Sequence, residues 1–154
     1  MELALADFKV AADGGRASTV RVCFPDHYGS VRGRRLPAET FLASPMTHQA
    51  FCDGALVWDV QCEIFEETDF SNYRTGYPDL YAVPDLASIR RCGWTDSEWL
   101  VLCDAVDADD VPIWVDPRGC LRTISERAGA GHSVRPSVSM RLAGEDFALS
   151  LIHI

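Results

Sequence analysis

Residues 20–37 read Val-Arg-Val-Cys-Phe-Pro-Asp-His-Tyr-Gly-Ser-Val-Arg-Gly-Arg-Arg-Leu-Pro. Apolar side chains alternate in the first part and place Val20, Val22 and Phe24 on one face, which is typical of a half-buried strand. Residues 25–29 are turn-forming types, and a second, basic strand follows over 30–36. The stretch therefore predicts a β-hairpin with one buried face.

The segments after the hairpin predict an α+β domain, in which a small mixed sheet packs on one helix. The apolar run 99–103 is expected to be the central strand, and residues 1–16 a turn or flexible entry. Residues 52–78 are acidic and aromatic without periodicity, which is typical of a functional segment or of one that covers a partner. The other expected elements are a helix at 37–42, a helix or turn at 47–51, strands at 80–83 and 111–115, and a helix at 118–130.

The composition restricts the possible partners. The 154 residues carry a formal net charge of -9 and a pI of about 4.7, and an acidic chain repels phosphate backbones, so no nucleic acid partner is expected. The chain has neither an apolar run long enough for a membrane span nor a secretory signal, which favours a cytoplasmic protein without membrane contact. None of the six cysteines forms a C-x-x-C pair, and free thiols are expected.

Short motifs follow the hairpin in a fixed order. They are Phe51-Cys52-Asp53-Gly54, Asp79 with Val83-Pro84-Asp85, Trp94, Cys103-Asp104, and Asp116-Pro117-Arg118. Together with the hairpin, this order resembles the amino-terminal β-grasp domain of the glutamine synthetase family. Gly76-Tyr77-Pro78-Asp79 is more similar to a divergent branch, which includes ligases thought to join glutamate to amines other than ammonia.

The resemblance implies an activity that this chain would share only as a part of a longer enzyme. The family forms an amide from glutamate and ammonia or an amine, with ATP and Mg²⁺ or Mn²⁺. Its active sites lie between neighbouring subunits of a homo-oligomeric ring, where the β-grasp domain of one subunit supplies a loop that closes the site of the next. The fragment alone is therefore expected to be inactive and to bind no cofactor or metal.

Asp53 is the one residue that we expect to be catalytic. In the family the matching aspartate helps to bind ammonium and to remove its proton, which suits a carboxylate. A simple Asp-Gly turn is the alternative. Ala55 and Leu56 stand where the family tends to have serines, which counts against a role specific to ammonia.

Other polar side chains are weaker candidates. The acidic residues after the Asp-Gly step could bind a metal or an amine substrate, but we expect them to form a solvated face. The histidines lack the spacing of metal ligands. The arginines of the second strand could face a nucleotide phosphate or an acidic neighbouring subunit, and two tryptophans are expected in the core or at an interface. These sets are Glu63, Glu66, Glu67 and Asp69; His27 and His48; Arg32, Arg34 and Arg35; and Trp94 and Trp99.

The expected domains are the β-grasp domain at 17–118, the start of a truncated catalytic domain at 119–148, and a tail at 149–154. Glu145 and Asp146 loosely resemble the Glu-x-Glu-Phe metal motif of that second domain, without sufficient likeness to assign metal ligands. The tail, Leu-Ser-Leu-Ile-His-Ile, is the in-frame translation of the transposon end used in shotgun library preparation and is expected to be adapter-derived. The alternatives are a free-standing β-grasp binding module and a structural interface domain.

Overall fold

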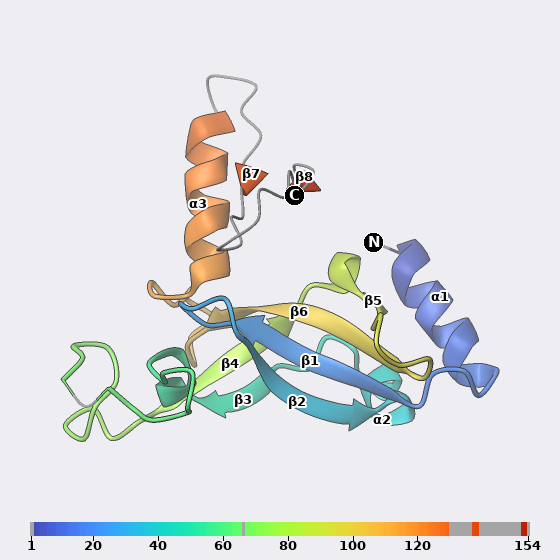
Figure 1. The fold of residues 1–154 in the computed structure, drawn as a ribbon, viewed down its shortest axis with the longest axis horizontal. Coiled ribbons are helices and arrows are strands. Elements are labelled where there is room, and N and C mark those ends of the chain that lie inside the picture. Colours follow the sequence, from blue (N-terminus) through green and yellow to red (C-terminus); the bar gives the residue numbers. More distant parts are fainter. Residues whose placement is uncertain (1, 66, 130–136, 139–151, 154) are drawn as a thin grey trace, which may run out of the picture. The chain divides into compact units, whose positions relative to one another are not determined.

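The computed structural model describes residues 2–65, 67–129, 137–138 and 152–153. The chain divides into two compact units, Met1–Gly119 and Cys120–Ile154. In the first unit a six-stranded sheet has the order β2-β1-β6-β4-β3, with β5 paired to β6 (Figure 1). The strands are β1 (Thr19–Pro25), β2 (Val31–Pro37), β3 (Gln49–Cys52), β4 (Asp79–Pro84), β5 (Arg90–Arg91) and β6 (Glu98–Val106).

The sheet is mixed, since β1 and β6 run parallel and the other pairs run antiparallel. With the helices that pack against it, this confirms the α+β class predicted from the sequence. The strand β6 is central, as expected, because it pairs with β1, β4 and β5.

The hairpin β1–β2 forms where the sequence predicts it, and its turn is built around Asp26. This buried carboxylate accepts hydrogen bonds from the backbone N–H groups of Tyr28 and Ser30 and pairs with Arg32 Nε at 2.8 Å. Gly29 has a φ of 78°, a left-handed conformation that glycine adopts without strain. The turn residues of the hairpin thus serve backbone geometry.

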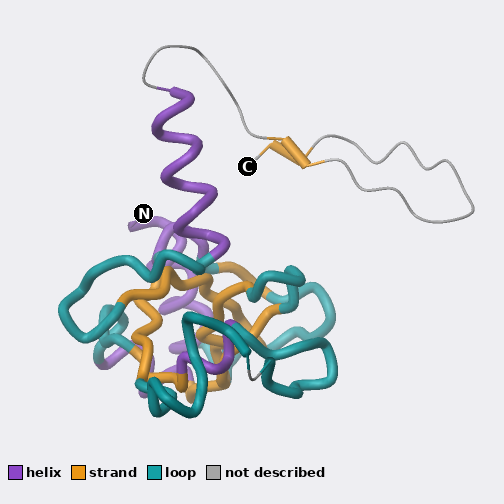
Figure 2. Tube along the Cα trace, turned by 90° about the vertical axis from the view of Figure 1, so that its left-hand side faces the viewer, coloured by secondary structure: helices purple, strands orange, loops and turns teal. Residues whose placement is uncertain are grey.

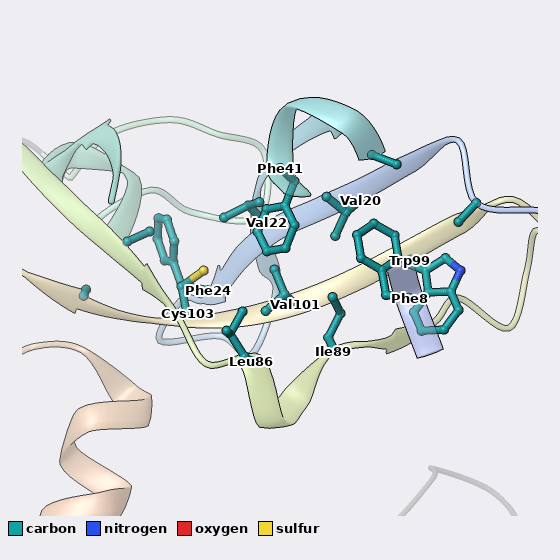
Figure 3. Close-up of a cluster of buried hydrophobic side chains, with 14 of the residues drawn as sticks. Phe8, Val20, Val22, Phe24, Phe41, Leu86, Ile89, Trp99, Val101 and Cys103 are labelled. Atoms are coloured by element: carbon teal, nitrogen blue, oxygen red, sulfur yellow. The ribbon is translucent and has the colours of Figure 1, made fainter. Parts of the chain in front are cut away.

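The core lies on one face of the sheet (Figure 3). The three side chains predicted to face inward from β1, Val20, Val22 and Phe24, are completely buried. They pack with Val101 of β6 and with Phe41 of the helix α2 (Ala38–Ala43). The buried face of β1 is therefore the one predicted from the sequence.

The first residues differ from the prediction, because Glu2–Asp13 form the helix α1. Phe8 of this helix is completely buried and lies 5.2 Å from the ring of Trp99, centroid to centroid. Ala4, Phe8 and Ala11 recur at helical spacing and all contact the core. The sheet therefore packs against two helices, α1 and α2, rather than one.

Two further elements differ from the prediction. Residues 49–52 form the strand β3 instead of a helix or turn. Among the described residues, segment 111–115 makes only an isolated bridge between Pro112 and Val106. The last predicted helix agrees, since α3 spans Pro117–Gly129.

In the second unit, β7 (Ser137–Val138) pairs with β8 (Ile152–His153). Glu145, Asp146 and most of the 149–154 tail lie outside the described residues.

Long loops of the first unit lie around the strands (Figure 2, teal and orange). The longest connects the short 3-10 helix η1 (Asp53–Leu56) to β4. No helix in the part of the chain that the structure describes is long and apolar enough to cross a membrane. All six cysteines are free thiols, and Cys23, Cys92 and Cys103 are buried.

Candidate functional site

Three of the ordered motifs meet in one ion-pair network. Arg118 pairs with Asp104, with 2.8 Å between Nε and Oδ1, and also with Asp85. These residues belong to the Asp-Pro-Arg, Cys-Asp and Val-Pro-Asp motifs, which lie far apart in sequence. The network joins the start of α3 to the ends of β4 and β6, so these motifs have a structural role.

Asp116 also has a structural role, as the cap of α3. Its carboxylate accepts hydrogen bonds from the N–H groups of Arg118 and Gly119, and from the N–H of Ala105 in β6. Pro117 occupies the first helical position, where its missing N–H costs nothing. Burial of Asp116 raises the pKa of its carboxyl group despite these hydrogen bonds.

Asp53 differs from Asp116, because it belongs to a short 3-10 helix and caps no long helix. It opens η1 directly after β3, and only 4% of the residue is exposed. Ser71 Oγ donates a 2.6 Å hydrogen bond to Asp53 Oδ1, and the Asp53 N–H donates to the carbonyl oxygen of Pro78 at 2.9 Å. The long loop thus holds Asp53 at two points, the carboxylate through Ser71 and the backbone N–H through Pro78.

The surroundings of Asp53 raise the pKa of its carboxyl group above the usual value. Burial raises the pKa of Asp53 most, and the negative charge of Asp79 adds to the increase. The hydrogen bonds from Ser71 and from the Gly54 N–H oppose this change. A carboxyl group with a raised pKa is a better proton acceptor and is typical of functional sites.

Asp53 borders a hollow of about 350 Å³ at the end of the sheet. Asp79, Asp107 and Asp109 contribute further carboxylates to its lining, while Phe70, Pro78, Leu80 and Ile113 contribute apolar walls. Carboxylates attract a cation and apolar walls suit a short aliphatic group. The hollow is therefore chemically suited to a small organic ammonium ion.

Ser71, the hydrogen-bond partner of the Asp53 carboxylate, is a residue that sequence reasoning missed. Ser71 is completely buried and lies 18 positions from Asp53 in the chain. No local motif predicts that Ser71 contacts Asp53, or that Asp79 lies close to Asp53. The one available signal was the aperiodic segment 52–78, which was expected to be functional or to cover a partner and which contains Ser71.

The arginines of β2 find partners within the domain. Arg32 pairs with Asp26 and donates to the carbonyl oxygen of Asp59 at 2.7 Å. Arg34 donates to the carbonyl oxygen of Ala50, and Arg35 pairs with the buried Glu98. All three arginines thus have partners within the domain, and Arg34 and Arg35 also line a hollow of about 300 Å³ together with Arg21.

The other weaker candidates are dispersed. His27 Nδ1 contacts the Leu56 carbonyl oxygen, and His48 pairs with Asp110 at 3.4 Å. Glu63, Glu67 and Asp69 are exposed, and Glu66 falls outside the described residues. Trp99 is buried in the core, whereas Trp94 is 66% exposed. Within the described ranges, no group of three or more His, Cys, Asp or Glu residues could hold a metal ion.

Comparison with known proteins gives relatives of one kind. The chain is 31% identical over 116 residues to a glutamate–isopropylamine ligase from Pseudomonas sp, which covers 71% of this chain and 24% of that protein. It is 28% identical over 141 residues to a gamma-glutamylethanolamide synthetase from Streptomyces coelicolor, covering 91% and 30%. A type-1 glutamine synthetase from Dictyostelium discoideum is 29% identical over 108 residues, covering 70% and 21%. No protein-family model matches the chain.

Solved structures show the same fold. A GmaS–ADP complex superposes with a TM-score of 0.59 at 19% identity, over 80% of this chain and 25% of that one. A glutamine synthase homologue gives a TM-score of 0.63 at 23% identity, over 75% and 27%.

The relatives matched by sequence form one class, that of glutamine synthetase-like ligases. Over most of its length the chain is homologous to glutamine synthetase-like ligases, as its motifs predict. It spans about a fifth to a third of the length of these curated relatives.

Proposed function

We propose that this chain is the amino-terminal β-grasp domain of an ATP-dependent ligase that joins glutamate to ammonia or to another amine. The loop that carries Asp53 completes the active site of a neighbouring subunit in a homo-oligomer. The observation that carries the proposal is the place of Asp53, held by Ser71 beside an acidic and partly apolar hollow. The helix α3 is then the first helix of the catalytic domain.

In this proposal Asp53 binds the ammonium form of the amine and accepts a proton from it. The raised pKa of Asp53 suits the second task. The first task is shared by the carboxylate of Asp79, which adds negative charge on the same hollow. Residues outside this chain bind ATP, glutamate and the divalent metal, since the chain corresponds to only part of its relatives.

The apolar part of the hollow favours an alkylamine over ammonia. Phe70 and Ile113 offer surface that ammonium cannot use, whereas an alkyl group would bury against it. The names of two relatives, a glutamate–isopropylamine ligase and a gamma-glutamylethanolamide synthetase, agree with this preference.

The test is to recover the genomic coding region that contains these residues and to express its product beside the 154-residue chain. Both are assayed for ATP-dependent γ-glutamylamide formation with ammonia and a series of short alkylamines. We expect product only from the longer protein, and a higher kcat/KM with an alkylamine than with ammonia. Activity of the short chain would contradict the proposal that residues outside this chain bind ATP, glutamate and the metal. A coding region that ends with this domain would instead favour a free-standing binding module.

A further inference from the structure

Ser71 lies against the Asp53 carboxylate without bordering the hollow beside it. The residue is completely buried, and its Oγ donates to Asp53 Oδ1 over 2.6 Å. Asp53 and Thr75 line the hollow, whereas Ser71 does not. Ser71 can therefore act on a molecule in this hollow only through Asp53.

The hydrogen bond has the length expected for a hydroxyl group that donates to an ionised carboxylate, about 2.5–2.7 Å. Burial and the charge of Asp79 raise the pKa of Asp53, whereas the hydrogen bond from Ser71 lowers it. The other charged groups that line the hollow, Asp79 of β4 and Asp107 and Asp109 after β6, are carboxylates and cannot donate a hydrogen bond when ionised. Among the side chains that act on Asp53 in the described part of the chain, Ser71 is thus the donor that favours its ionised form.

Hydrogen bonds within segment 68–75 fix the backbone that carries Ser71. Thr68 Oγ1 donates to the carbonyl oxygen of Ser71 at 2.6 Å and accepts from its N–H at 3.2 Å. Asn72, which is only 5% exposed, donates from Nδ2 to the carbonyl oxygen of Thr68 and accepts at Oδ1 from the N–H of Arg74. Neighbours fixed in this way hold a functional side chain close to its working geometry. The loop's own contacts therefore direct the Ser71 hydroxyl group at Asp53.

We propose that Ser71 is a positioning residue of the ligase, whose hydroxyl group orients the Asp53 carboxylate and keeps it ionised for the ammonium form of the amine. The proposal rests on the function proposed above for Asp53. A carboxylate that is already fixed at one oxygen loses less freedom when the amine binds to it. An ionised carboxylate also attracts the ammonium ion and can accept its proton, which a protonated one cannot do. A serine that only supported the fold would affect neither step.

The first measurement is the titration of the Asp53 carboxyl group by ¹³C NMR in the 154-residue chain. In Ser71→Ala the carboxylate loses a donor, so we expect its titration midpoint to move to higher pH. Ser88→Ala is the matched control, because the Ser88 hydroxyl group donates to the carbonyl oxygen of Asp85 at 2.7 Å and Ser88 does not line the hollow. The control should leave the midpoint of Asp53 in place. An unchanged midpoint in Ser71→Ala would overturn the proposal.

The second measurement is a double-mutant cycle in the longer protein, with kcat/KM for the amine followed against pH. Ser71→Ala should lower kcat/KM about tenfold and move the acid limb of its pH profile to higher pH. It should add nothing to the effect of Asp53→Asn, because Ser71 acts through Asp53. Equal losses with and without the Asp53 carboxylate would contradict the positioning role.

Ser71→Cys keeps the test decisive if Ser71→Ala lowers stability, since a thiol has a similar size but is a weaker donor. It should move the acid limb in the same direction. Wild-type profiles in both Ser71 variants beside an impaired Asp53→Asn would refute the role of Ser71 alone. A wild-type kcat/KM in Asp53→Asn would instead refute the proposed function, and the role of Ser71 with it.

Discussion

Asp53 and Glu98 are both nearly buried carboxylates, yet their surroundings act on them in opposite directions. Asp53 has the hydroxyl of Ser71 and the negative charge of Asp79 as neighbours, and its pKa is raised, chiefly by burial. Burial also acts to raise the pKa of Glu98. There, hydrogen bonds from Arg21 and Trp94 and the charges of Arg21 and Arg35 outweigh it and hold the pKa below its usual range. Stability should therefore depend on pH differently at the two sites.

Asp53→Asn should stabilise the fold at neutral pH. Because the pKa of Asp53 is higher in the folded chain than in the unfolded one, its charged form lowers stability as pH rises through the folded pKa. Asparagine removes this cost and can still accept from Ser71. Thermal unfolding at pH 7 and at about pH 3 measures the effect, which should vanish at the lower pH. A destabilised variant at pH 7 would show that the carboxylate is structural.

Glu98→Gln should have the opposite effect. The pKa of Glu98 is lower in the folded chain, so its charge contributes stability that is present above the unfolded pKa and lost as pH falls through the folded one. We expect a loss of about 1 kcal/mol at pH 7, limited because Arg35 is largely exposed. The loss should disappear in acid. Equal destabilisation at both pH values would mean that packing, not charge, is the cause.

At the scale of the elements, the β1–β2 hairpin depends on Gly33, which stands opposite Cys23 in the register. A Cβ at Gly33 would lie 2.6 Å from the Cβ of Cys23 and would also clash with the carbonyl oxygen of Val22. The two strands approach too closely for any side chain there. This explains the glycine in the Arg-Gly-Arg motif of β2.

Gly33→Ala should therefore destabilise the domain by about 2–3 kcal/mol, because the clash is with backbone and cannot relax by a rotamer change. Gly93→Ala is the matched control, since a Cβ there meets nothing within 4 Å. Urea unfolding of both variants, followed by circular dichroism, makes the comparison. Similar free energies of unfolding of the two variants would show that β1 and β2 can move apart to admit a side chain without loss of stability.

The hairpin, the central strand and α3 could be predicted because local pattern determines them. Val20, Val22 and Phe24 alternate, and Asp116-Pro117 marks a helix start. The helix α1 was not predicted because Asp13-Gly14-Gly15 indicates a turn, while only the spacing of Ala4, Phe8 and Ala11 indicates a helix. The strand β3 was missed because Gln49–Cys52 has no pattern of its own and takes its conformation from pairing with β4.

The candidate site could be predicted only in part, for a related reason. Asp53 was found through the order of motifs, and its role remains a proposal. Ser71 lies 18 residues from Asp53 in the chain, and an irregular loop brings the two together. Such a loop has no sequence periodicity from which the contact could be predicted.

At the scale of the whole molecule, most of the shared motifs have structural roles. Arg118, Asp104 and Asp85 join α3 to the sheet, and Asp26 and Gly33 fix the hairpin. Asp53 stands apart, since its neighbours form a hollow rather than a strand junction, while its burial also raises its pKa, as it does for Asp116. A residue that costs stability and borders a hollow is more readily explained by function than by folding.

The central claim is that Asp53 serves the reaction of a glutamate–amine ligase, and kinetics of Asp53→Asn in the longer protein test it most directly. The control is Asp13→Asn, at the exposed end of α1. We expect kcat/KM for the amine to fall about 100-fold or more, as for the loss of a general base, with the control unchanged. The KM values for glutamate and ATP should stay within about twofold, because the proposal assigns their binding to residues outside this chain. A variant with wild-type kcat/KM for the amine would contradict the account.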